Sequence, residues 1–83
     1  MPRQQRPSQA ALGTVVRELR HKRGLTIEGL AHGAGLHPTY VSGIERGRNN
    51  PSLEALSQLS AALKVPLSEI VRRAEASTET NGD

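Results

Sequence analysis

Glycine and proline interrupt the chain at short intervals, and the segments between them place apolar residues at helical spacing. In the first segment Leu12, Val15, Val16 and Leu19 follow an i, i+3, i+4, i+7 pattern, which forms one apolar stripe on a helix. Related spacings recur in four later segments, each with a capping residue at its start. We therefore predict five helices: one between Ser8 and Gly24, one from Thr26 to about residue 34, one over 37–46, one from Ser52 to about residue 64, and a short one after Ser68.

The composition favours a single small all-α domain. The 83 residues include one Tyr, no Phe and no Trp, and Leu and Ala outnumber the residues that favour strands. The absence of Cys excludes disulfides and zinc fingers. No apolar run approaches the roughly 18 residues of a membrane span, and none resembles a signal peptide. We expect a soluble, cytoplasmic protein that binds no membrane.

The sequence contains no pattern typical of an enzyme or a metal site. There is no nucleophile elbow, P-loop or HExxH motif. His21, His32 and His37 are separated by 11 and 5 residues, so they do not share one helix face, and no Cys joins them. We therefore expect no catalysis, no metal, no cofactor and no small-molecule ligand.

Charge and composition divide the chain into regions. Residues 1–7 are predicted to be a flexible basic arm, residues 8–76 the folded domain, and residues 77–83 a disordered tail. Residues 1–48 carry a net charge of +5 and residues 49–83 a net charge of −2. This asymmetry indicates either one side that faces a polyanion or ordinary solvated charge.

Residues 26–47 are typical of a helix-turn-helix unit. A short helix is followed by a tight turn at Gly33-Ala34-Gly35 and then by a second helix. Ala31 is small enough to let two helices approach closely, and Leu36 after the turn can fill the space between them. The second helix of such a unit lies in the major groove of DNA.

With these motifs the chain resembles the lambda-repressor-like, Cro/repressor (XRE) type of helix-turn-helix protein over residues 10–74. The resemblance rests on LGTVVRELRHKRGLT at 12–26, AGL at 34–36, TYVSGIERG at 39–47, NPSLEAL at 50–56 and LSAALKV at 59–65. The block TYVSGIERGRNNPSL is especially similar to the controller proteins of restriction–modification systems. The resemblance implies a compact five-helix DNA-binding domain.

The outward face of the third predicted helix is the candidate base-reading surface. At 100° per residue, Thr39, Ser42, Gly43 and Arg46 lie opposite Val41 and Ile44. The Thr and Ser hydroxyls are suited to hydrogen bonds with base edges, Gly43 leaves room for close approach of DNA, and Arg46 is suited to guanine or phosphate. Pro38 and Tyr40 flank this face. The alternative is that these residues are simply exposed to solvent.

Helix ends and loops supply the candidate phosphate contacts, because their free N–H groups attract anions. The candidates are Thr26, Tyr40, Arg48, Asn49, Asn50 and Arg17. Tyr40 is equally suited to cover the rim of the core. We expect Arg3 and Arg6 to lie in solvent. The resemblance further implies a partly buried ion pair between Arg20 and Glu45 that fixes the recognition helix.

Three positions depart from the family pattern. Ile27 replaces a Gln that usually touches phosphate, and Gly29 replaces a Glu that completes a capping box. Pro38 has no side-chain donor, so it contacts bases through apolar atoms or not at all. These differences prevent an operator sequence from being transferred to this chain.

Apolar residues near the end of the chain are candidates for a homodimer interface. They are Leu67, Ile70 and Val71, with Leu67 and Ile70 alternatively forming the lid of the core. The function that we predict is a homodimeric, sequence-specific transcriptional regulator that binds double-stranded DNA at a palindromic operator. The alternatives are the DNA-binding antitoxin of a toxin–antitoxin pair and a protein-interaction module that has lost DNA binding.

Overall fold

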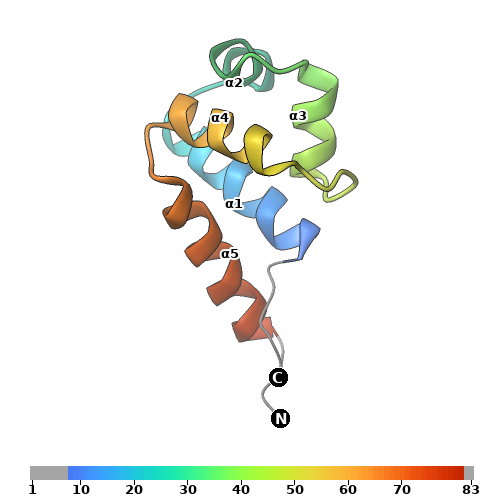
Figure 1. Ribbon diagram of the computed structural model, residues 1–83, viewed down its shortest axis with the longest axis vertical. Helices are drawn as coiled ribbons and strands as arrows, with labels where there is room; N and C mark the ends of the chain where they lie inside the picture. Colours follow the sequence, from blue (N-terminus) through green and yellow to red (C-terminus); the bar gives the residue numbers. More distant parts are fainter. Residues whose placement is uncertain (1–7, 82–83) are drawn as a thin grey trace.

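The structure, a computed structural model, describes residues 8–81, with side chains through residue 77, and in this part of the chain it contains five α-helices and no strand (Figure 1). The helices are α1 (Gln9–Lys22), α2 (Ile27–Ala34), α3 (Pro38–Glu45), α4 (Leu53–Leu63) and α5 (Leu67–Asn81). The all-α prediction is therefore confirmed. The basic arm predicted over residues 1–7 lies outside the described residues.

Hydroxyl side chains fix the starts of three helices. Ser8, Thr26 and Ser52 each accept a hydrogen bond from the amide of the third residue of the helix that follows, at 2.9–3.0 Å. The recognition-helix candidate α3 has a less usual cap, because Nδ1 of His37 accepts from the amide of Thr39 at 3.1 Å. These caps satisfy amides that have no partner within their own helix.

The turn between α2 and α3 depends on a left-handed residue. Gly35 has a φ of 69°, a conformation that glycine adopts without strain. The amide of Leu36 then reaches back to the carbonyl of Ala31 at 2.9 Å, which closes the end of α2. The half-buried Leu36 side chain packs against the core beyond this turn.

One apolar core joins all five helices. α1 packs against α3, α4 and α5, while α2 packs against α3 and α4. Every helix contributes at least one side chain that is almost fully buried, and the largest of these are Val16, Leu30, Val41, Ile44, Leu59, Leu63 and Ile70. Figure 1 shows α2 and α3 at one end of the molecule and α5 at the other.

The backbones of α1 and α3 approach each other at Gly13. A Cβ atom added to Gly13 would overlap the carbonyl oxygen of Ile44 and lie 2.7 Å from that of Glu45. Only glycine fits this crossing without movement of a helix. No local sequence pattern marks Gly13 as the site of this contact.

The last helix differs from its prediction. α5 begins at Leu67 rather than after Ser68, and it continues to Asn81. Residues 77–81 are therefore helical where a disordered tail was predicted, and residues 82–83 lie outside the described part. Neither Gly nor Pro occurs between Pro66 and Gly82, so nothing in the sequence ends the helix earlier.

The first turn of α5 is held by charge pairs. Glu69 accepts hydrogen bonds from Nη2 of Arg72 at 2.5 Å and from Nε of Arg73 at 2.6 Å. These bonds, the one from Arg73 foremost, hold the pKa of Glu69 below its usual value. Pairs at i, i+3 and i, i+4 stabilise a helix modestly.

Leu53, at the start of α4, lies outside the buried apolar stripe of that helix. Leu53 is 71% exposed, whereas Ala55, Leu56, Leu59 and Leu63 are buried. Leu53 lies about 90° around the helix from the centre of the buried stripe, which places it at the edge of the packed face.

No helix within residues 8–81 is long and apolar enough to cross a membrane.

We predict that Gly13→Ala lowers the free energy of unfolding by about 1–3 kcal/mol, because the added methyl group forces α1 and α3 apart. Gly33→Ala is the matched control: its Cβ would meet only the Cβ of Ala62, at 3.6 Å. Since alanine favours helix, we expect Gly33→Ala to be neutral or to stabilise by up to about 1 kcal/mol. Urea denaturation followed by circular dichroism measures both, and equal effects of the two substitutions would contradict the prediction.

Candidate nucleic-acid interface

α2, the turn at Gly35 and α3 form a helix-turn-helix unit at one end of the molecule (Figure 1). Ala31 is completely buried in α2, as its small side chain suggested. On α3, Val41 and Ile44 are completely buried, which turns the opposite face of the helix outward. The core therefore determines which side of α3 is available to a ligand.

The outward face of α3 brings four predicted residues together. Thr39 and Arg46 are exposed, and Ser42 and Gly43 are half-buried. These four residues line a hollow that is completed by Arg48 and Asn49 from the following loop. The hollow contains no acidic side chain and two arginines, so it has the chemistry of an anion-facing surface.

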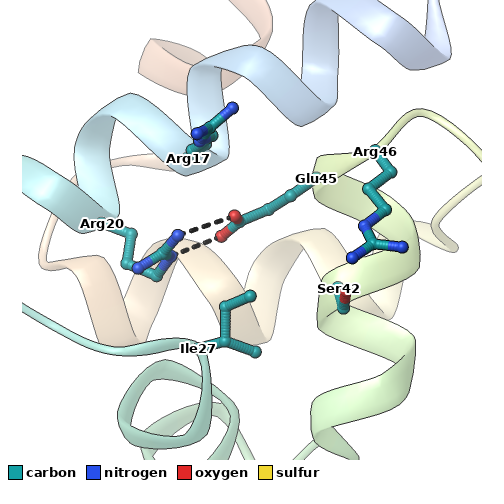
Figure 2. Close-up of a pocket in the computed structure, with 6 residues that line it drawn as sticks. All are labelled: Arg17, Arg20, Ile27, Ser42, Glu45 and Arg46. Carbon is teal, nitrogen blue, oxygen red and sulfur yellow. Dashed lines mark hydrogen bonds and ion pairs between the residues drawn. The ribbon is translucent and has the colours of Figure 1, made fainter.

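Arg20 and Glu45 form a bidentate ion pair behind this face (Figure 2). Nε of Arg20 donates to Oε2 of Glu45 at 2.7 Å, and Nη2 donates to Oε1 at 3.0 Å. Nη1 donates to the carbonyl oxygen of Leu25 at 2.9 Å. The two side chains are only 10% and 5% exposed. The pair therefore ties the end of α3 to α1 and to the connection between α1 and α2.

The charge of Arg20 is maintained by its surroundings. The hydrogen bond to Glu45 raises the pKa of the guanidinium, against the smaller opposing effect of burial. The group therefore stays protonated wherever the protein is folded. A planar, permanently charged fork suits this position better than a lysine would.

Two further arginines flank the ion pair without taking part in it. Arg17 of α1 and Arg46 at the end of α3 line a hollow with Ser42, Ile27 and the Arg20–Glu45 pair (Figure 2). Within residues 8–77 neither Arg17 nor Arg46 has a side-chain hydrogen bond or an ion pair. Both guanidinium groups are available to an anion.

The loop after α3 is held by hydrogen bonds to α3 itself. Nδ2 of Asn49 donates to the carbonyl oxygen of Tyr40 at 3.4 Å, and the amide of Ser52 donates to the Tyr40 hydroxyl at 3.4 Å. The amides of Arg48 and Asn49 donate to the carbonyl oxygen of Gly43 at 2.9 and 3.3 Å. Tyr40 thus joins α3 to the start of α4.

Gly43 makes this arrangement possible. A Cβ atom at Gly43 would overlap the side-chain nitrogen Nδ2 of Asn49 and lie 2.8 Å from the Cγ atom of that residue. The side chain of Asn49 therefore fills the space beside Gly43, where the close approach of DNA is predicted from the sequence. The side-chain amide of Asn49 is predicted to contact phosphate; in the structure it donates a hydrogen bond to the carbonyl oxygen of Tyr40.

The remaining phosphate candidates surround the same face. Thr26, Arg48 and Asn50 are exposed. The hydroxyl of Thr26 is used as the cap of α2, where it accepts a hydrogen bond from the amide of Gly29. Ile27 is half-buried and packs against the core, in agreement with the loss of the polar residue usual at this position.

The predicted dimer residues on α5 divide into two groups. Ile70 is completely buried in the core of the monomer, so its assignment to an interface is wrong and the lid alternative is correct. Val71 and Leu67 are half-buried and share one face of α5. Ile70 faces inward because the stripe Ile70–Ala74 covers α1.

Sequence reasoning missed two features of the site. Gly13 lies against the backbone of Ile44 and Glu45, which are distant from it in sequence. Gly43 lies against the side chain of Asn49, which belongs to the loop after α3. A glycine within a predicted helix is a weak signal of close approach. It does not identify the partner.

Comparison with known proteins places this geometry among related chains. A sequence model of the helix-turn-helix family matches residues 16–70. The HTH-type transcriptional regulator DdrOP3 of Deinococcus deserti is 38% identical over 60 residues, which cover 72% of this chain and 46% of the relative. This chain spans about half the length of the curated relatives it matches, with 46%, 40% and 54% of three of them covered.

Solved structures are similar over most of the chain. The restriction-modification controller protein C.AhdI from Aeromonas hydrophila has a TM-score of 0.74 and 40% identity, covering 75% of this chain and 94% of its own. SinR, a master regulator for biofilm formation solved in complex with DNA, has a TM-score of 0.68 and 33% identity, covering 71% of this chain and 95% of its own.

We predict that removing either partner of the buried ion pair lowers the free energy of unfolding by about 3–5 kcal/mol, because the other charge is left buried and alone. Arg20→Met and Glu45→Met test this in urea denaturation. The double substitution is expected to recover much of the loss, since it leaves no unpaired charge. Strictly additive effects would show that the two side chains do not interact.

Proposed function

The chain belongs to the helix-turn-helix family, and we propose that it is a sequence-specific DNA-binding transcriptional regulator whose α3 enters the major groove. The observation that carries this proposal is the hollow on the outward face of α3, whose lining combines the hydroxyl residues Thr39 and Ser42 with Arg46 and Arg48 and includes no acidic residue. The similarity to SinR, solved in complex with DNA, supports the same reading.

Each residue of the interface has a chemical role in this proposal. Thr39 and Ser42 hydrogen-bond base edges, and Arg46 contacts guanine or phosphate at the end of α3. The exposed Arg48 and Asn50 contact the phosphate backbone.

Arg17 extends the proposed phosphate surface beyond the helix-turn-helix unit. It stands on α1, lines the same hollow as Arg46, and has no partner of its own within residues 8–77 (Figure 2). Two free guanidinium groups from different helices suit two positions along one DNA strand. Tyr40 and Asn49 support this surface, since their hydrogen bonds hold the loop after α3 in place.

We further propose that the protein acts as a homodimer on a palindromic operator. One α3 contacts only a few base pairs. Two copies of the protein related by a two-fold axis would bind two half-sites about one turn of the DNA helix apart, which doubles the number of base pairs recognised. Leu67 and Val71 are the apolar residues on α5 that the core leaves partly open. They belong to α5, which lies at the end of the molecule opposite α2 and α3 (Figure 1).

In-vitro selection from a random double-stranded library tests the proposed function. We expect a two-fold-symmetric consensus whose binding weakens steeply as salt increases, because phosphate contacts release counterions. Failure to recover any consensus, together with no affinity at low salt, would refute DNA binding and favour a protein-interaction module.

We predict that Val71→Glu converts the dimer to a monomer and lowers operator affinity, because two carboxylates would face each other across the two-fold axis. Analytical ultracentrifugation measures the mass. Ala76→Glu, which also adds one negative charge in place of a neutral residue but at an exposed position of α5, is the matched control. A dimer that survives Val71→Glu would place the interface elsewhere.

A further inference from the structure

Two hollows meet at Ile27 beside the outward face of α3. The first is lined by the free arginines Arg17 and Arg46. The second lies between the start of α2 and the start of α3, and its lining includes Leu25, Ile27 and Pro38. Arg20, Ile27 and Ser42 belong to both, so the two hollows form one continuous surface.

The two hollows differ in charge. In the first, Arg17 and Arg46 have no partner within residues 8–77. The charged residues that line the second hollow are Arg20, which is neutralised by Glu45, and the acidic residue Glu28, so this lining carries no unpaired cation. A phosphate group is therefore attracted to the first hollow and disfavoured in the second. The second hollow suits an uncharged group.

The second hollow also has an apolar surface that is held in place. Leu25 and Ile27 are half-buried and pack against the core, so their exposed atoms do not move freely. Pro38 is the first residue of α3 and presents a rigid ring without a side-chain donor. The hydroxyls of Thr39 and Ser42 border this apolar surface and continue it onto the base-reading face.

The edges of base pairs in the major groove carry one apolar group, the C5 methyl of thymine. Resting on the DNA-binding function proposed above, we propose that the second hollow binds the C5 methyl group of a thymine in each half-site. Ile27 and Pro38 are then specificity-determining residues, which select a base by apolar contact where neighbouring hydroxyls select by hydrogen bonding. Ile27 stands where the family usually has a polar residue, and in this proposal it contributes to the selection of a base.

Uracil substitution tests the inference with the unaltered protein. Each thymine of the selected operator is replaced in turn by uracil, which removes only the C5 methyl group, and affinity is measured by fluorescence anisotropy. We expect one position to lose about fourfold affinity per half-site, the effect of exposing one buried methyl group. If uracil at every position leaves affinity unchanged, the inference is overturned.

Variants assign the effect to the second hollow. Ile27→Ser is expected to bring the thymine-to-uracil affinity ratio at that position close to one. Arg17→Ala, in the first hollow, is the matched control: it should weaken binding to both DNAs equally and leave the ratio unchanged. A ratio that persists in Ile27→Ser overturns the role of Ile27.

The outcomes separate the two proposals. A selection without a consensus overturns the proposed function and this inference together. A consensus that contains no uracil-sensitive thymine overturns only the inference.

Discussion

The bidentate pair between Arg20 and Glu45 holds the short helix α3 in the orientation that the rest of the interface requires. α3 spans only Pro38–Glu45, and a helix of this length is not stable alone. Its two completely buried residues, Val41 and Ile44, fix which face turns inward. The ion pair then fixes the helix along its axis, because it connects the last residue of α3 to α1 and to the carbonyl of Leu25.

The polar groups around α3 separate into those with partners and those without. Asn49, the Tyr40 hydroxyl and the Thr26 hydroxyl are all engaged in hydrogen bonds within the domain. Arg17 and Arg46 have no partner within residues 8–77. An interface needs both groups, since the engaged residues hold the backbone in position and the free ones remain available to a ligand.

The two ends of the molecule have different chemistry, and the described core separates them. α2 and α3 form one end of the molecule (Figure 1), and the free guanidinium groups beside α3 come from Arg46 at its end and from Arg17 of α1. α5, at the other end, covers α1 with Ile70 and Ala74 and leaves Leu67 and Val71 partly open. A monomer built in this way can pair through one end without obstructing the other.

The sequence by itself determined the five helices, their caps at Ser8, Thr26 and Ser52, and the residues on the outward face of α3. These features depend on local spacing and on hydrogen bonds within a few residues, which a linear pattern records. Only the tertiary structure decided that the backbone of α3 packs against Gly13, that the side chain of Asn49 occupies the space at Gly43, and that Ile70 belongs to the core. Each of these depends on atoms brought together by packing of separate elements, and the distance between such atoms has no local signature.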